Sequence, residues 1–243
     1  MSNTKKTFRA KENAEILSID IGGSNLKAAI LDHKGAVLHE YIMIPTPKPA
    51  TPEILLAAIE ALIAGFPGYD YISAGFPGYV KDGVVKTAPN LGTPQWTGVD
   101  FRLMLEERLG KPAKLINDAD MQGLGVAEGK GLELVITLGT GLGSALIMDG
   151  KLLPHLELAH HPVTKDEDYD QYIGEAAMNR IGRTRWNKRM VRVLQILKTV
   201  VNYDKLYIGG GNAGALDVPL DSNIQIISNK DGIRGGARLW TIP

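Results

Sequence analysis

The chain of 243 residues contains no cysteine. This absence excludes a disulfide framework, a thiolate nucleophile and a cysteine-ligated zinc site. Lysine and arginine together number 27, as do aspartate and glutamate, so no net charge attracts the chain to nucleic acid or to a membrane surface. No apolar run reaches the roughly eighteen residues of a membrane-spanning helix, so none is expected.

The first residues also lack the apolar core of a signal peptide, although four of them are basic. We therefore expect a flexible tail over residues 1–14 and a cytoplasmic protein. With 44% hydrophobic residues, the remainder is long enough for two domains with cores of their own. We expect an N-terminal α/β lobe over residues 15–116 and a C-terminal α/β lobe over residues 117–243.

One stretch, residues 16–27, combines an apolar run, an acid and a glycine turn. The run is too short for a helix and rich in β-branched residues, which predicts a buried strand. Gly22 and Gly23 permit a tight turn that lets a ligand approach the backbone. The turn can present N–H groups to a phosphate, with Asp20 placed to hold a hydrated cation beside it. Two side chains can add hydrogen bonds: Ser24 and Asn25. A plain hairpin turn is the alternative.

The same arrangement of strand, glycine turn and strand occurs again around residues 132–148, which indicates an internal duplication of pattern. A third glycine cluster follows the predicted strand 205–208. Three such turns are hard to explain as idle loops, and together they suggest a nucleotide or polyphosphate chain as ligand. The residues concerned are Thr140 and Gly141 in the second turn and Gly209, Gly210 and Gly211 in the third.

Strands that recur between helices predict an α/β protein, in which ligands bind beyond the carboxyl ends of the strands. We expect two lobes with the active site in the cleft between them. Asp118 follows the predicted strand 113–116 and precedes a helix predicted over residues 121–128. Its carboxylate suits a general base for phosphoryl transfer to a hydroxyl, a role that supplies about 10²–10⁴-fold in rate.

The order of four motifs resembles the ROK sugar kinases of the actin-like ATPase superfamily, and their polyphosphate glucokinase branch in particular. The motifs are Asp-Ile-Gly-Gly-Ser at 20–24, Asn-Asp-Ala at 117–119, Leu-Gly-Thr-Gly-Leu-Gly at 138–143 and Glu-Leu-Ala-His at 157–160. A basic stretch at 182–189 adds to the likeness, which extends over residues 15–240. The resemblance implies an actin-like ATPase (ribonuclease H-like) fold and a glucokinase.

The resemblance also implies roles for single residues. Asp118 would be the base on the sugar 6-hydroxyl, and Asp20 would organise Mg²⁺ through water. Further sugar contacts would come from Asn90, Asn117, Glu157, His160 and Glu175. The phosphates would lie against Gly22, Gly23, Ser24, Asn25, Thr140 and Gly141, with Gly209, Gly210 and Gly211 beside an adenosine or the distal phosphates. Lys27 would neutralise phosphate charge, with a surface lysine as the equal alternative.

The resemblance implies Mg²⁺ as cofactor and polyphosphate, ATP or both as phosphoryl donor. Zinc is not expected, because the cysteine-rich zinc site of most ROK kinases has no counterpart here. The expected partners are a small-molecule sugar, the donor and a second copy of the chain as a homodimer, with neither nucleic acid nor a membrane. A metal site at His155, His160 and His161 is disfavoured. Adjacent residues such as His160 and His161 point apart in regular structure, and no third ligand stands at suitable spacing.

The stretch from Arg180 to Lys198 contains seven basic residues and no acid. Arg185, Lys188 and Arg189 are spaced three or four apart on a helix predicted over residues 172–201, either as one helix or as two joined helices. A solvated helix face and a track for a polyanion are equally open interpretations.

Two alternatives to a glucokinase remain: an ATP-dependent kinase of another hexose, or a sugar sensor without turnover. A dinucleotide oxidoreductase is discounted, because no Gly-x-Gly-x-x-Gly follows the first strand.

Overall fold

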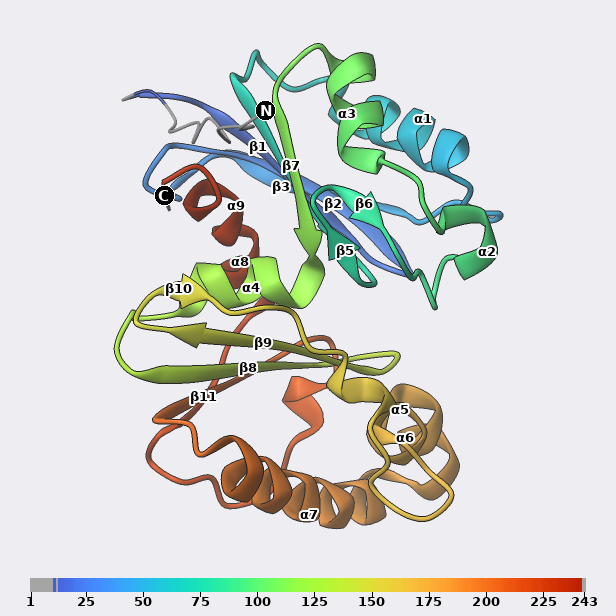
Figure 1. Cartoon of the computed structure of the whole chain (residues 1–243), viewed down its shortest axis with the longest axis vertical. Coiled ribbons are helices and arrows are strands. Elements are labelled where there is room, and N and C mark those ends of the chain that lie inside the picture. Colours follow the sequence, from blue (N-terminus) through green and yellow to red (C-terminus); the bar gives the residue numbers. More distant parts are fainter. Residues whose placement is uncertain (1–10, 12, 242–243) are drawn as a thin grey trace, which may run out of the picture. The chain divides into compact units, whose positions relative to one another are not determined.

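The computed structural model describes residue 11 and residues 13–241 (Figure 1). Most of the predicted flexible tail, residues 1–10 and 12, lies outside the described residues. The chain forms two compact units. Unit 1 comprises residues 1–116 together with 233–243, and unit 2 comprises residues 117–232.

Unit 1 is built on a five-stranded sheet in the order β3-β2-β1-β4-β7. Its strands are β1 (Ile16–Ile21), β2 (Asn25–Leu31), β3 (Val37–Pro45), β4 (Tyr71–Phe76) and β7 (Ala113–Asn117). Strand β1 pairs antiparallel with β2 and parallel with β4. A separate hairpin joins β5 (Val80–Lys81) to β6 (Val84–Val85) through Asp82 and Gly83, both at positive φ.

Helices cover both faces of this sheet. Helices α1 (Pro52–Ile63) and α3 (Phe101–Leu109) lie on one face and α9 (Gly235–Arg238) on the other (Figure 1). Helix α3 begins where Asp100 accepts a hydrogen bond from the Leu103 N–H at 2.9 Å. The loop predicted over residues 87–98 contains a short helix, α2 (Thr93–Trp96). Its Trp96 is fully buried in the core and packs edge-on against Phe101.

Unit 2 repeats the same sheet, with strand order β10-β9-β8-β11-β12. Its strands are β8 (Leu132–Leu138), β9 (Leu142–Met148), β10 (Lys151–Leu152), β11 (Lys205–Gly209) and β12 (Ile224–Ile226). Strand β8 pairs antiparallel with β9 and parallel with β11, as β1 does with β2 and β4. The duplication predicted from the glycine turns is therefore present in the topology of both units.

In unit 2, helix α4 (Asp118–Val126) covers one face of the sheet. The opposite face is covered by α5 (Tyr169–Ile173), α6 (Glu175–Ile181) and α7 (Arg183–Val201) (Figure 1). The prediction of two joined helices over residues 172–201 is confirmed by α6 and α7, except that Tyr172 and Ile173 belong to α5. The chain breaks at Gly174, whose backbone is extended, and at Gly182, whose φ of 79° is accessible chiefly to glycine.

A buried carboxylate shapes the loop that leads into β8. Glu133 is 1% exposed and accepts hydrogen bonds from the N–H groups of Glu128, Gly129 and Lys130. The Tyr207 hydroxyl donates a fourth at 3.0 Å, and burial, followed by contact with Glu133, raises the pKa of Tyr207 to about 12. These four donors compensate the cost of burying the charge.

The end of the chain corrects the predicted lobe boundary, because it packs on unit 1 and not on unit 2. The Ser18 hydroxyl donates to the Ile233 carbonyl at 2.8 Å, and the Ser73 hydroxyl donates to the Gly236 carbonyl at 2.6 Å. Trp240 is 1% exposed and lies against Tyr71, with 4.5 Å between the ring centroids. Helix α8 (Asn229–Ile233) leads into this segment.

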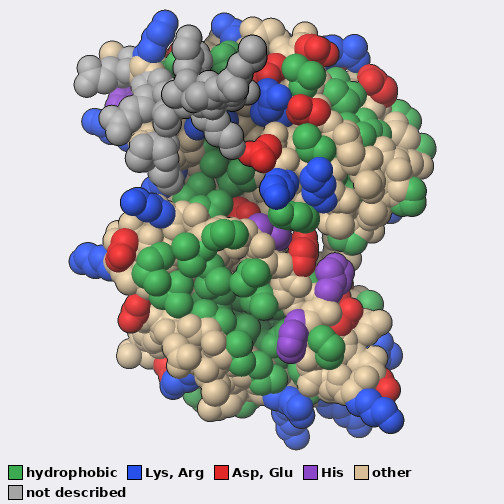
Figure 2. Space-filling model, in the orientation of Figure 1, with side chains coloured by type: hydrophobic (Ala, Val, Ile, Leu, Met, Phe, Trp, Pro, Cys, Tyr) green, Lys and Arg blue, Asp and Glu red, His purple; other side chains and the backbone are tan. Residues whose placement is uncertain are grey.

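The described part of the chain holds no helix with the length and hydropathy that crossing a membrane requires. On unit 2, hydrophobic side chains gather over β8, β9 and β10 (Figure 2). Met148, the last residue of β9, is 39% exposed, and Leu156, which follows β10 in the sequence, is 49% exposed. Such a patch is typical of a surface that meets another protein.

Candidate active site

The first glycine turn joins β1 to β2 in unit 1. The Gly22 N–H donates to the Asn25 carbonyl at 2.9 Å, and the Thr46 hydroxyl donates to the Gly22 carbonyl at 2.6 Å. Thr46 also donates its N–H to the carbonyl of Ser24. A Cβ at Gly22 would stand 2.9 Å from the Asn25 oxygen, so only glycine fits. The end of β3 therefore fixes the shape of this turn.

Asn90 lies against the same turn. A Cβ at Gly23 would be 3.0 Å from the Cβ of Asn90, so the second glycine lets this side chain approach the backbone. Asn90 is exposed and belongs to the loop between β6 and α2. The structure thus brings together two predicted parts of the site within unit 1.

Asp20 and Lys27 face each other across β1 and β2. The Lys27 ammonium donates to Asp20 Oδ2 at 2.8 Å, and the two side chains are only 16% and 12% exposed. Burial lowers the pKa of Lys27, but the attraction of Asp20 outweighs it and the pKa is raised. The alternative of a surface lysine is therefore wrong.

The donor set tests the expectation of Mg²⁺. Within the described residues, no group of three His, Asp or Glu side chains is arranged to hold a metal ion. Magnesium is commonly held by one or two carboxylates together with substrate phosphates and waters. Asp20, with the first glycine turn two residues further on, fits that arrangement and not an all-protein cage.

Asn117 and Asp118 start helix α4 in unit 2. The Asn117 side-chain oxygen caps the helix by accepting from the N–H groups of Ala119 and Asp120, at 2.8 and 3.1 Å. Helix α4 therefore begins three residues earlier than predicted, and Asp118 is its first residue. Asp118 Oδ1 accepts from the Ala119 N–H at 2.8 Å, and the residue is half-buried. The cap orients this carboxylate at the start of the helix.

A buried ion chain that sequence reasoning missed follows on the same helix. His155 Nδ1 lies 3.0 Å from Asp120 Oδ2, and its Nε2 lies 3.3 Å from Glu157 Oε1. The His155 and Asp120 side chains are 7% and 6% exposed. Burial lowers the pKa of His155, but the two carboxylates outweigh it and raise the pKa to about 9. The imidazole is therefore a cation at neutral pH.

Of the predicted sugar residues, Glu157 precedes the short helix η1 (Leu158–His160) and His160 is its last residue. The close contact with His155 lowers the pKa of Glu157, against the opposing effect of burial, so its carboxylate stays ionised. His160 is exposed. Burial raises the pKa of the nearby Asp170, although its carboxylate accepts from the Leu142 N–H at 2.7 Å.

The second glycine turn joins β8 to β9 in unit 2. The Gly139 N–H donates to the Gly141 carbonyl at 3.1 Å, as Gly22 does to Asn25 in unit 1. A Cβ at Gly141 would lie 2.2 Å from Asp170 Oδ1, so any larger residue there would displace the Asp170 carboxylate. The Gly139 carbonyl accepts from the N–H of Glu175 at 2.9 Å, so the first residue of α6 lies against this turn.

The third glycine turn packs on the second. Gly210 has a φ of 89°, and a Cβ there would lie 2.3 Å from the Leu138 carbonyl oxygen. Asn212 donates its N–H to the Leu138 carbonyl and its side-chain amide to the Gly139 carbonyl. Three predicted segments therefore meet in unit 2, and they contain Thr140 and Gly141, then Glu175, then Gly209, Gly210 and Gly211.

The basic face of unit 2 is largely paired within the chain. Lys and Arg side chains gather over α7 (Figure 2). The described partners are Glu167 for Arg180 and Arg189, the Ala215 carbonyl for Arg183, the Val163 carbonyl for Arg192, and Asp221 for Lys198. Among the described residues, none pairs with the exposed Arg185 or Lys188.

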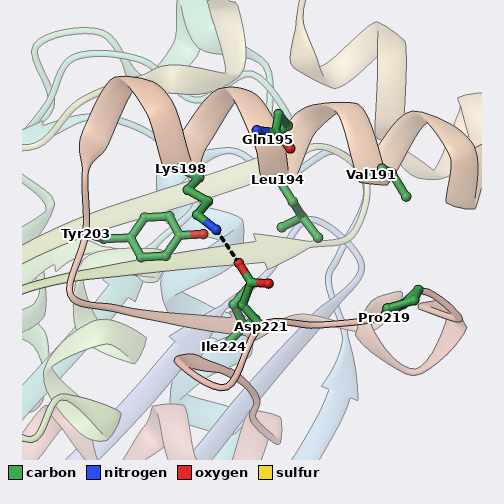
Figure 3. Close-up of a pocket in the computed structure, with 8 residues that line it drawn as sticks. All are labelled: Val191, Leu194, Gln195, Lys198, Tyr203, Pro219, Asp221 and Ile224. Carbon is green, nitrogen blue, oxygen red and sulfur yellow. Dashed lines mark hydrogen bonds and ion pairs between the residues drawn. The ribbon is translucent and has the colours of Figure 1, made fainter.

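A hollow of about 150 Å³ lies beside the second half of α7 (Figure 3). The Lys198–Asp221 ion pair, at 2.6 Å, crosses it between apolar side chains such as Leu194 and Ile224. None of the predicted site residues lines this hollow.

Comparison with known proteins gives a consistent result. Residues 16–160 match the ROK family. A polyphosphate glucokinase of Mycobacterium tuberculosis (strain ATCC 25177 / H37Ra) is 32% identical over 250 residues, which cover 96% of this chain and 94% of that protein.

Solved structures agree. The inorganic polyphosphate/ATP-glucomannokinase of Arthrobacter sp. strain KM matches with a TM-score of 0.84 and 33% identity, over 94% of this chain and 99% of that chain. A ROK family glucokinase of Streptomyces griseus, solved with glucose and AMPPNP, matches with a TM-score of 0.77. It is 21% identical over 93% of this chain and 98% of that chain, so this likeness shows the fold alone.

Proposed function

Because this chain belongs to the ROK family and is a sugar kinase with the actin-like ATPase fold, we propose that it phosphorylates the 6-hydroxyl of glucose. The phosphoryl donor is polyphosphate, ATP or both. The observation that carries the proposal is the capped start of α4, which presents the half-buried Asp118 carboxylate in the unit that also holds Glu157 and the second glycine turn.

On the acceptor side, Asp118 takes the proton of the 6-hydroxyl as its oxygen attacks the terminal phosphorus of the donor. The bond from that phosphorus to the rest of the donor breaks, and the shortened donor leaves with the electron pair. Asn90, Asn117, Glu157, His160 and Glu175 bind the other sugar hydroxyls. Because Glu157 is ionised, it acts there as a hydrogen-bond acceptor.

On the donor side, N–H groups of the glycine turns other than those of Gly22 and Gly139, which are bonded within the turns, bind phosphate oxygens. Ser24, Asn25 and Thr140 add side-chain donors. Gly209, Gly210 and Gly211 border the distal phosphates or an adenosine. Mg²⁺ bound with the donor would neutralise the charge that develops on the transferred group. Asp20 would hold this cation through water, and Lys27 holds the Asp20 carboxylate in place.

The contacts of the basic side chains on α7 indicate which of them could bind a polyphosphate donor. Four α7 side chains, and Arg180 of α6, are held by Glu167, Asp221 or backbone carbonyls, which favours a role in folding for most of this face. Arg185 and Lys188 are the residues of this face that remain for a polyphosphate chain. ATP alone as donor would leave the glucokinase assignment intact.

Asp118→Asn tests the base. The amide keeps the shape of the side chain and its bond to the Ala119 N–H, but it cannot accept the proton. We expect glucose 6-phosphate formation to fall by about 10²–10⁴-fold with either donor, with glucose affinity in calorimetry nearly unchanged. Asp166→Asn is the matched control, because Asp166 is exposed on a loop of the same unit. Full activity of the Asp118→Asn protein would refute the proposed base.

The assay is run separately with ATP and polyphosphate. Glucose binding without product from either donor would favour the second candidate, a sugar sensor. We also propose a cytoplasmic homodimer, for which the apolar patch around Met148 and Leu156 is the supporting feature.

A further inference from the structure

The buried chain Asp120–His155–Glu157 links two parts of unit 2 that are distant in the sequence. Asp120 lies in the first turn of α4, two residues after Asp118. His155 and Glu157 lie between β10 and η1. The His155 imidazole therefore makes two contacts. One is with α4, the helix that begins with the proposed base, and the other is with Glu157, the carboxylate proposed to bind the sugar.

In the series Asp120–His155–Glu157, a cationic side chain lies between two anionic ones. An imidazolium has two N–H groups, and here they face Asp120 Oδ2 at 3.0 Å and Glu157 Oε1 at 3.3 Å. The imidazole and the Asp120 carboxylate are more than nine-tenths buried, whereas the Glu157 side chain is 31% exposed. The chain thus starts in the protein interior and ends at a group that solvent, or a sugar, can reach.

A carboxylate that accepts bonds from sugar hydroxyls needs a fixed orientation and a negative charge. Without a partner, the Glu157 side chain has several rotamers, and burial alone would raise its pKa. His155 opposes both effects at once, because it restrains one carboxylate oxygen and favours the ionised form. Asp120 in turn restrains the imidazole by holding its other nitrogen.

We propose that His155, held by Asp120, is a positioning residue that orients the Glu157 carboxylate to accept a hydrogen bond from a hydroxyl of the hexose. The proposal rests on the proposed function, since it takes Glu157 as a sugar-binding group. His155 itself does not touch the reacting atoms. Partners of this kind, which orient a ligand-binding side chain, typically change affinity by about 10–100-fold when they are mutated around metal sites.

The test compares His155→Gln with His39→Gln, whose site is exposed on β3 of unit 1. Glucose affinity is measured by calorimetry, and KM and kcat are measured with saturating donor. For His155→Gln we expect a roughly 10-fold or greater rise in the dissociation constant and KM for glucose, with KM for the donor unchanged. His39→Gln should leave all of these values as in the wild type.

Asp120→Asn gives a second, milder variant. The amide oxygen can still accept from the imidazole, but the charge that helps to hold the proton on His155 is gone. Asp120 and Glu157 are the charged groups that act on this imidazole. We therefore expect KM for glucose to become pH-dependent between about pH 6.5 and 8 in Asp120→Asn, an interval over which the wild type stays nearly flat because the pKa of its His155 is about 9. Imidazole nitrogen shifts in NMR follow the His155 proton directly.

The possible outcomes distinguish a failure of the positioning role from a failure of the proposed glucokinase function. Unchanged glucose affinity in a folded His155→Gln protein would overturn the positioning role and leave the glucokinase assignment standing. A lowered melting temperature with unchanged KM would overturn it too, since the ion chain would then serve folding alone. If the wild type binds no glucose and forms no product, the proposed function fails first and the positioning role fails with it.

Discussion

At the residue scale, the proton on His155 couples folding to pH. Its pKa is about 9 in the folded protein, against 6.5 for an ordinary histidine. The folded chain therefore retains a proton that the unfolded chain releases above pH 6.5. The resulting stabilisation is complete below pH 6.5 and is lost as the pH rises through 9. We expect the free energy of unfolding, measured in urea, to fall by about 1–3 kcal/mol over this interval.

Replacing His155 by Gln should remove this slope, because no group then titrates at that position. His39→Gln should keep it, since His39 is exposed on β3. A slope of the same size in the His155→Gln protein would assign the pH dependence to other groups.

Single residues also show where sequence reasoning stops. The acid at Asp118 was predictable, because its position after a strand and its chemistry are local. The contact between His155 and Asp120 spans 35 residues and depends on how the segment after β10 returns to α4. The sequence offered only an indirect signal: a histidine two residues before Glu157 and an acid two residues after Asp118.

At the scale of elements, the junction between α5 and α6 fixes the second glycine turn. A Cβ at Gly174 would lie 2.5 Å from the carbonyl oxygens of both Thr140 and Asp170. The φ of −63° at this position suits alanine, so the conflict is steric and not conformational. Gly174→Ala should therefore displace the turn. We expect a loss of about 1–3 kcal/mol in stability and a higher KM for the phosphoryl donor.

Gly214→Ala is the control for this substitution, because nothing lies within 4 Å of a Cβ there. Thermal unfolding and initial rates measured on both variants separate the steric effect from a general effect of alanine. Equal melting temperatures and equal donor KM values would show that the turn tolerates the added methyl group.

Some helix and strand bounds follow from local sequence signals and could be predicted, whereas others depend on tertiary contacts and could not. The strand, glycine turn and strand around residues 132–148 were predictable, because apolar runs between turn residues are a local signal. The three-helix division of residues 169–201 was not, because Gly174 and Gly182 break the chain for reasons of tertiary contact and positive φ. The start of α4 was misplaced because its cap, Asn117, is also the last residue of β7.

At the scale of the whole molecule, the chain leaves unit 1, builds unit 2 and returns. The two sheets share one strand order, of which the repeated glycine turns predicted only the duplicated unit of strand, turn and strand. The return of the last residues was not predictable, because it depends on two buried serines. Ser18 and Ser73 find their hydrogen-bond acceptors only in residues 233–236, and a Cβ at Gly236 would lie 2.3 Å from Ser18 Oγ.

This return predicts that unit 1 cannot complete its fold until the end of the chain is present. Without residues 233–243, two serine hydroxyls would lose their acceptors and the faces of β1 and β4 would lose their cover. Trp240 contributes most of the apolar contact, since it is buried against Tyr71 and donates to Ser73 Oγ at 2.9 Å. Trp240→Ala should destabilise unit 1 by about 3–5 kcal/mol.

Tryptophan fluorescence can follow each unit separately in the Trp240→Ala protein, because Trp96 is buried in unit 1 and Trp186 in unit 2. In the protein that reports on unit 1, Trp186 is replaced by Phe, and in the protein that reports on unit 2, Trp96 is replaced by Phe. The same two proteins with Trp240 intact serve as the reference. We expect the Trp96 transition to move to lower urea concentration while the Trp186 transition moves much less, since no residue after Gly232 belongs to unit 2. Two transitions that shift together by the same amount would mean that the units unfold as one, and that the last residues stabilise the whole chain.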